Sequence, residues 1–491
     1  MRSVRRTIWA ACFMIGLISP VARGQQQGDQ PPPTPADQPA APIPAYRSPL
    51  ASAADNGGDE GLIADPNKLI PDSHSLTGAQ TFSLGEMATH HSYWQPHVDF
   101  TSTVDSNGVN TTTATGWTTW STFYGGVDLH RIAGNSDLSM LYSGGASVSN
   151  DGSANNGIIQ NLAVSERLAY RRATISLLDQ LNYLPENAFG SQFGNLGSPL
   201  GSGSVGLQPG LIPGQSILTA GGQRLSNTLV PEVDVKLTPR TSLTFVGTYS
   251  LLHYFDNNLL NYYTGGIIVG YNHQMTRNDT IGLSYAFNAY RYTNFNQSIN
   301  DNLVHISYGR RVTGKLGFQI AAGPEFTSFV MPITGAGTTG MASNSGSNLY
   351  WSLNMSLTYQ LRRTGLGLTY AHGVSGGSGV QAGSISDTVT ASANRQITRT
   401  FSGIWNLSYA RNNGSTVNGP MSITANQTFS YWSNNIGVSH IMGRTMNLGL
   451  NYLLQYQNSN SAFCVGPTCG SSFLRHEILF SVGWRDHPIP F

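Results

Sequence analysis

The sequence predicts an all-β chain that folds as a transmembrane, antiparallel, up-and-down β-barrel of about 18 strands. Three observations lead to this prediction: few charged residues, long stretches in which apolar and polar residues alternate, and short turns that alternate with longer polar loops. Only 10% of the 491 residues are charged, against roughly 25% in soluble globular proteins. The formal net charge of +1 gives no basis for a nucleic-acid partner.

The first 96 residues differ in composition from the rest of the chain. We expect residues 1–24 to be a cleaved signal peptide, because arginines precede an apolar run and the small-residue triplet Ala22-Arg23-Gly24. Residues 25–60 are rich in Gln, Pro and Ala, which predicts a disordered periplasmic linker. Residues 61–96 show no periodic pattern and are interpreted as a periplasmic segment or a short plug.

From residue 97 to residue 491 the sequence predicts the barrel itself. In WSLNMSLTYQL (351–361), large apolar residues alternate with Ser, Asn, Thr and Gln, so each kind occupies one face of a strand. Similar runs recur with lengths of about ten to fourteen residues, which suits a tilted membrane strand better than the roughly five to six residues of soluble sheets. A spanning sheet must close on itself, because unpaired backbone groups are costly in hydrocarbon. The alternative is a soluble all-β secreted protein.

The strand count follows from the connections. Eight short turns are predicted at 133–136, 171–174, 238–241, 275–279, 312–315, 361–365, 397–400 and 442–445. Longer loops rich in Gly, Asn and Ser are predicted at 106–116, 148–156, 182–229, 255–260, 292–300, 331–347, 374–384, 412–426 and 458–471. Nine long loops and eight short turns imply eighteen strands, and merged or split segments would give about 16 or 20.

With this architecture, the sequence resembles the β-barrel porin families of the outer membrane of Gram-negative-type bacteria. The resemblance covers roughly residues 97–484 and includes a last strand with one apolar face that ends at Trp484. It implies outer-membrane lipid and the barrel insertion machinery as partners, and a homotrimer as one form of assembly. Members commonly end in an aromatic residue that the machinery reads. Here Asp486, Pro488 and Pro490 separate Trp484 from the terminal Phe491, so either aromatic is a candidate for the signal.

The inward faces of the predicted strands carry mainly Ser, Thr, Asn, Gln and Gly. Their exceptions are Asp234, Lys236, His305, Arg475 and Glu477. A neutral lining of hydroxyl and amide groups favours small, uncharged hydrophilic solutes such as sugars. The longest loop, 185–227, follows the fifth predicted strand and resembles the constriction loop of general porins in position, with Glu186 and Arg224 as its charged residues. It is interpreted either as a constriction or as an outer lid.

Basic residues gather at the short turns. The predicted periplasmic basic rim comprises Arg172, Arg240, Arg277, Arg311, Arg363, Arg399 and Arg444. We favour anchoring of these side chains at phospholipid headgroups over attraction of anionic substrates. At the other side of the barrel, Cys464 and Cys469 close a short loop and are expected to form a disulfide in an exported chain.

Catalysis is not expected. The chain contains no HExxH or GxSxG motif and no compact Ser/His/Asx grouping, and no cofactor or metal site is predicted. The leading hypothesis is therefore a porin-like channel for small hydrophilic solutes. A polysaccharide-export barrel and a non-conducting surface adhesin or structural barrel are the alternatives.

Overall fold

The computed structural model describes residues 82–83, 92–107, 116–149, 156–184, 206–207, 223–255, 261–293, 297–313, 315–332, 343–361, 363–377, 382–414, 428–443, 445–459 and 472–491. The predicted signal peptide, the linker and most of segment 61–96 therefore lie outside the described residues. No helix in these ranges is long and apolar enough to cross a membrane.

The described residues form a closed antiparallel barrel of eighteen long strands, as predicted. Its strands are Tyr93–Asp105 (β2), Thr118–Ala133 (β3), Ser136–Ser149 (β4), Gly157–Ala169 (β5), Ala173–Leu184 (β6), Arg224–Thr238 (β8), Thr241–Tyr254 (β9), Tyr262–Gln274 (β10), Asp279–Tyr292 (β11), Ser298–Arg311 (β12), Leu316–Pro332 (β13), Ser343–Gln360 (β14), Thr364–Gly377 (β15), Ala382–Gln396 (β16), Phe401–Gly414 (β17), Thr428–Met442 (β18), Met446–Ser459 (β19) and Phe473–Arg485 (β20). Two short pairings accompany them: Phe82–Ser83 (β1) pairs with Gly206–Leu207 (β7), and Ile489–Pro490 (β21) pairs with β2.

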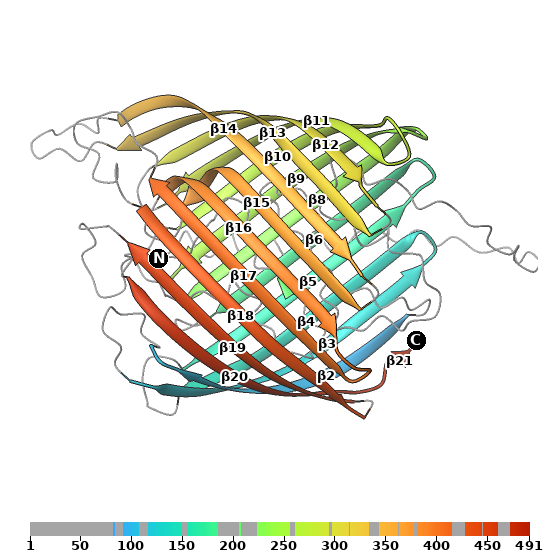
Figure 1. The fold of residues 1–491 in the computed structure, drawn as a ribbon, viewed down its shortest axis with the longest axis vertical. Coiled ribbons are helices and arrows are strands. Elements are labelled where there is room, and N and C mark those ends of the chain that lie inside the picture. Colours follow the sequence, from blue (N-terminus) through green and yellow to red (C-terminus); the bar gives the residue numbers. More distant parts are fainter. Residues whose placement is uncertain are drawn as a thin grey trace, which may run out of the picture. The chain divides into compact units, whose positions relative to one another are not determined.

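The barrel is a meander in which each strand pairs with its sequence neighbours (Figure 1). The first strand, β2, pairs with β3 on one side and with the last strand, β20, on the other, and this second pairing closes the barrel. Closure therefore leaves no unpaired strand edge at the β2–β20 junction. A sheet in hydrocarbon requires this, because unpaired backbone groups are costly there.

The eight predicted short turns are confirmed, and they all connect strands at the same end of the barrel, called here the short-turn end. Three of them share a threonine that explains their geometry. The hydroxyls of Thr276, Thr313 and Thr398 each accept backbone N–H bonds from the residues two and three positions later, at 3.0–3.3 Å. Such bonds satisfy backbone donors inside a tight turn and fix the register of the two strands.

At the opposite, long-loop end, several strands are longer than the sequence predicted. The barrel also begins at Tyr93 instead of residue 97, but this extension lies at the short-turn end. At the long-loop end, β8 begins at Arg224, inside the segment 185–227 that was expected to be a loop. Similarly, β14 begins at Ser343 inside the expected loop 331–347. Gly, Ser and Asn weaken a strand in isolation, but pairing with a neighbouring strand satisfies their backbone groups and extends the ladder.

The outer face of the barrel is apolar. Large hydrophobic side chains that point outward and are exposed occur on most strands, among them Val98, Phe245, Ile281, Leu283, Phe326, Leu368, Ile436, Val438, Leu450, Ile478 and Phe480. The alternate positions of the same strands are polar and point inward. An apolar surface of this extent around a closed barrel has the properties of a membrane-spanning surface.

Candidate functional site: the inner wall of the barrel

The inner wall is polar and buried. On β2 the inward side chains are Gln95, His97, Asp99, Thr101, Thr103 and Asp105, each at most 5% exposed. Inward Ser, Thr, Asn and Gln side chains on the other strands are also mostly buried. An eighteen-stranded barrel normally leaves an aqueous channel, in which inward side chains would be exposed to water. The inward side chains of this barrel are instead largely buried.

A buried ionic group joins the first and last strands at the long-loop end. Arg475 of β20 directs both Nε and Nη2 at Oδ2 of Asp105 on β2, each at 2.7 Å, and Nη2 also contacts Glu477. Arg475 and Asp105 are at most 1% exposed. The Arg475 guanidinium also lies 5.7 Å from the ring centroid of Trp120 on β3. One cation thus contacts two carboxyl groups and bridges the closure of the barrel.

A second charged group lies across the same closure at the short-turn end. His97 Nδ1 is 3.5 Å from Asp128 Oδ1, and Arg485 Nη2 is 3.6 Å from Asp128 Oδ2. Two glycines make room for this group. A Cβ at Gly126 would overlap the His97 imidazole, and one at Gly483 would overlap Asp99 Oδ1.

Two inward carboxyl groups form a third cluster, on β12 and β13. Asp301 accepts a hydrogen bond from the Thr327 hydroxyl at 2.9 Å, and Glu325 Oε1 accepts one from the backbone N–H of Val374 on β15 at 3.0 Å. Both carboxyl groups are at most 2% exposed. Strand β15 is two strands away from β13, so the Glu325 bond is made on the inner side of β14.

The hairpin of β15 and β16 bends inward at this point. Tyr292, the last residue of β11, donates a hydrogen bond through its hydroxyl to the Gly376 carbonyl of β15. Ser375 and Ser384, on the two arms of the hairpin, are hydrogen-bonded to each other at 2.8 Å and buried. The end of β15 is therefore tied to β11 and β13 on the lumen side of the wall.

The inward bend separates β15 from β14. The two strands pair from Gln360–Gly365 only as far as Leu353–His372, whereas β14 pairs with β13 from Ser343 to Tyr359. Among the described residues, Ser343–Ser352 thus has a strand partner on one side only. The divergence of β14 from β15 is visible in Figure 1.

An apolar strip also lies on the inner wall. Leu178, Val230, Val246, Ile268 and Ala286 are buried neighbours on β6, β8, β9, β10 and β11, with Leu303 of β12 packed beside them. The strip interrupts the hydroxyl and amide lining that the sequence predicted. It limits the hydrogen bonds that the wall offers to a solute on this side.

The two residues expected in the constriction loop have different positions. Arg224 is the first residue of β8, is fully buried, and pairs in register with Leu184 and Tyr254. Glu186 lies outside the described residues, as do Cys464 and Cys469. The structure therefore brings Arg224 into the barrel wall instead of a loop.

The residues of the predicted basic rim lie at one end of the barrel. Arg172, Arg240, Arg277, Arg363 and Arg399 occupy the short turns, and Arg311 ends β12 beside another of them. Arg444 lies outside the described residues. The side chains at the turns are exposed, as either interpretation of the rim requires.

Of the five inward charges named from the sequence, Arg475 and Glu477 belong to the closure cluster, and His305 is buried on β12. Asp234 accepts a hydrogen bond from Thr244 across β8 and β9. The sequence reasoning missed Asp105, Asp301 and Glu325. Their signal was a carboxylate on the polar face of an alternating strand, which is visible in the sequence once the inward face is known.

In the part of the chain that the structure describes, no group of three or more His, Cys, Asp or Glu side chains could hold a metal ion.

No protein-family model matches the chain, and no curated protein matches it in sequence. Similar solved structures include OccK2 (OpdF) of Pseudomonas aeruginosa, with a TM-score of 0.39, 9% identity, and 80% of this chain and 98% of that chain covered.

Two further structures from Pseudomonas aeruginosa are similar at the same level. The outer membrane protein OpdK gives a TM-score of 0.37 at 9% identity, covering 80% of this chain and 99% of that chain. OpdQ gives a TM-score of 0.38 at 10% identity, covering 81% and 98%. Scores this low carry no argument about function, so the proposal below rests on the chain's own residues.

Proposed function

We propose that the protein is an outer-membrane channel through which small hydrophilic solutes pass. The observation that carries this proposal is the sidedness of the closed barrel, which is apolar outside and polar inside. Only helices and closed barrels satisfy their backbone groups in hydrocarbon, and spanning barrels are a feature of outer membranes.

The charges of the inner wall favour uncharged solutes. Arg475 is balanced by Asp105 and Glu477, and Arg485 is close to Asp128, so the cations at the barrel closure are compensated locally. Paired charges create little net field along a passage, and the carboxyl groups that pair with no cation among the described residues, Asp301 and Glu325, disfavour anions. Most of the remaining lining consists of hydroxyl and amide groups, which hydrogen-bond to neutral sugars or similar solutes.

The basic rim supports the orientation of this channel. Its arginines lie at the short-turn end, which faces the periplasm in barrels of this architecture. Long basic side chains at the edge of an apolar belt reach the phosphates of lipid headgroups. We therefore assign the rim an anchoring role.

A non-conducting barrel is the second candidate, and the burial of the inner wall favours it. Inward side chains such as Ser250, Ser384 and Ser481 are fully buried. Inward side chains that are closed to water line no path for ions at those positions.

Conductance of the refolded full chain in a planar bilayer separates the two candidates. Discrete current steps with weak ion selectivity are the expected result. Strong anion selectivity would contradict the preference for uncharged solutes and favour the export of acidic polymers. An inserted barrel that conducts no current, with heat-modifiable migration on a gel as proof of folding, would favour the non-conducting alternative.

A further inference from the structure

Five hydrogen bonds of one kind lie on the outer face of the described strands. Each joins an aromatic side chain to a polar side chain of the next strand: Tyr142 to Gln160 (2.6 Å), Tyr285 to Asn302 (2.8 Å), Tyr370 to Asp387 (3.0 Å), Trp405 to Asn434 (2.9 Å) and Tyr452 to His476 (2.8 Å). A sixth, from Tyr308 to Asp279, lies at the short-turn end. Polar groups on a lipid-facing surface are costly unless they are bonded, which explains why each has a partner.

The five bonds share one geometry. In register, the aromatic residue stands opposite an aliphatic residue: Leu162, Val304, Val389, Ile436 or Ile478. The polar partner lies two residues before this aliphatic residue, on the side of the long-loop end. Diagonal neighbours of this kind are within reach of aromatic side chains. All five aromatic groups therefore point toward the long-loop end.

The five polar partners all lie near the long-loop end of their strands. They follow the start of their strands by three residues in β5 and β20, four in β12, five in β16 and six in β18. These strands begin at the long-loop end and lie at separate places around the barrel. Gln160, Asn302, Asp387, Asn434 and His476 therefore form a ring, called here the outer polar ring.

In several strand pairs, the outward residues between the ring and the long-loop end are polar. On β11 and β12, Arg291 donates through Nη2 to Asn300 Oδ1 at 2.7 Å, just above Asn302. On β17, Arg411 is exposed and stands directly opposite Asp387. A change from aliphatic to basic and amide side chains is typical of the boundary between hydrocarbon and headgroups.

The divergence of β14 and β15 is an independent observation at the same height. The last outward side chain of β15 before the strands separate is His372, which stacks on Trp351 at a centroid distance of 4.0 Å and binds Asp387 of the ring at 2.7 Å. Beyond this point, β14 has an unpaired edge among the described residues. Such an edge is not tolerated in hydrocarbon, so the hydrocarbon ends at or below His372.

The remaining strand length matches a bilayer. From Asn302 to the end of β12 at Arg311, about ten residues at a rise of about 3.3 Å and a tilt of about 40° span about 25 Å. This equals the height of the apolar band of outer-membrane barrels, about 25 Å. The ring and the basic rim would then lie at opposite boundaries of one membrane.

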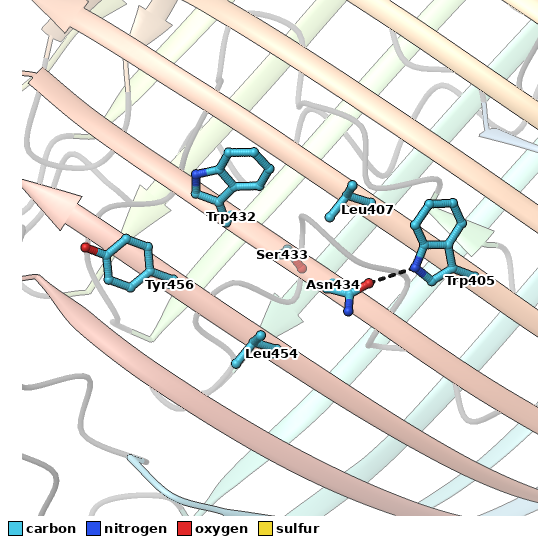
Figure 2. A pocket seen from close by; sticks show the side chains of 7 residues that line it. All are labelled: Trp405, Leu407, Trp432, Ser433, Asn434, Leu454 and Tyr456. Atoms are coloured by element: carbon cyan, nitrogen blue, oxygen red, sulfur yellow. Dashed lines mark hydrogen bonds between the residues drawn. The ribbon is translucent and has the colours of Figure 1, made fainter.

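At Asn434 the ring has an amide donor beside an apolar groove. Figure 2 shows the groove, of about 430 Å³, between Trp405, Trp432 and Tyr456, with Asn434 at its centre. Because indole nitrogen only donates, Trp405 fixes Oδ1 of Asn434 as the acceptor, and Nδ2 points elsewhere. An amide donor next to an apolar groove suits a lipid whose chain lies in the groove and whose ester carbonyl accepts the bond.

We propose that the outer polar ring binds the headgroup region of lipids in the leaflet at the long-loop end and sets the depth of the barrel in the membrane. This inference rests on the proposed membrane-spanning function. Its partner is a lipid surface, contacted through the carbonyl and headgroup oxygens that Asn, Gln and His side chains recognise.

The test is a depth measurement with spin labels in the full chain, after replacement of its cysteines by serine. Single cysteines replace Asn302, Asn434 or His476, and matched controls replace the aliphatic residues two positions deeper, Val304, Ile436 and Ile478. Accessibility to oxygen and to a water-soluble nickel chelate is measured in phosphatidylcholine vesicles. Each ring label should lie about 5 Å closer to the headgroups than its control, and all three ring labels should report an interfacial depth.

Ring labels that report the hydrocarbon centre or full exposure to water would overturn the proposal. A second measurement does not depend on labels. Lipid retained by the purified barrel is quantified for the unlabelled chain and for Asn434→Leu, and the variant should lose bound lipid while Leu450→Ala, on the outer face deeper in the belt, does not. Conductance of the same samples reports separately on the channel, so a silent barrel at the expected depth would contradict only the proposed function.

Discussion

Arg475 on the last strand of the barrel binds Asp105 on the first strand, and both side chains are almost completely buried on the inner wall. The two residues are 370 positions apart in the sequence. Their ion pair spans the β2–β20 junction, the pairing that completes the barrel. The ion pair therefore stabilises the strand junction that closes the barrel.

Replacement of Arg475 by Met is expected to destabilise the barrel strongly. The variant leaves Asp105 and Glu477 close together without a cation, and breaking a buried ion pair costs about 3–5 kcal/mol. Denaturant unfolding followed by the heat-modifiable band on a gel would measure the loss. Arg411→Met removes an exposed outward arginine and should change stability little. An unchanged midpoint for Arg475→Met would contradict a role of this pair in closure.

Gly126 provides a second test of the closure region. An alanine there is expected to destabilise the barrel by about 1–3 kcal/mol, because its Cβ would overlap the His97 ring and the Tyr142 carbonyl. The neighbouring Gly125 is a matched control, since a Cβ there meets nothing within 4 Å. Comparison of the two unfolding midpoints checks the prediction. Equal midpoints would show that the neighbouring side chains and backbone move to accommodate the added methyl group.

The sequence predicted the strand alternation and the eight short turns, because both are local. A residue's face follows from its parity, and turn threonines such as Thr276 fix the register of the strands that they connect. The same local patterns located the basic rim. They also identified the polar face of each strand, although not how the charges on it combine.

Pairs across the long loops were beyond sequence reasoning. Trp405 and Asn434 lie on strands joined by a long loop, which leaves their register open until the structure defines it. The closure pair Arg475–Asp105 depends on the contact of the first and last strands, and the Tyr292–Gly376 bond depends on an inward bend of β15. Each of these contacts depends on tertiary structure, which neither the turn residues nor the alternation of apolar and polar residues can predict.

The inward position of the β15–β16 hairpin is expected to depend on Tyr292. Tyr292→Phe removes the hydrogen bond to the Gly376 carbonyl and keeps the ring, at a cost of about 1 kcal/mol. Faster amide hydrogen exchange at residues 374–377 would report the release of the hairpin. Tyr452→Phe, which removes a hydroxyl on the outer face, should leave exchange in this segment unchanged. If exchange is equally slow in Tyr292→Phe, this bond does not hold the hairpin.

The last prediction concerns the bond between Trp405 and Asn434 (Figure 2). Trp405→Phe should destabilise the barrel by about 1 kcal/mol, because it removes the hydrogen bond to the Asn434 carbonyl oxygen. In the background Asn434→Leu, the same change should cost less, since no polar group then needs the indole N–H. The double-mutant cycle isolates this coupling from the loss of ring contacts. Additive effects would mean that the two side chains do not stabilise each other. As a control, Trp432→Phe in both backgrounds measures the effect of a smaller aromatic ring in the groove.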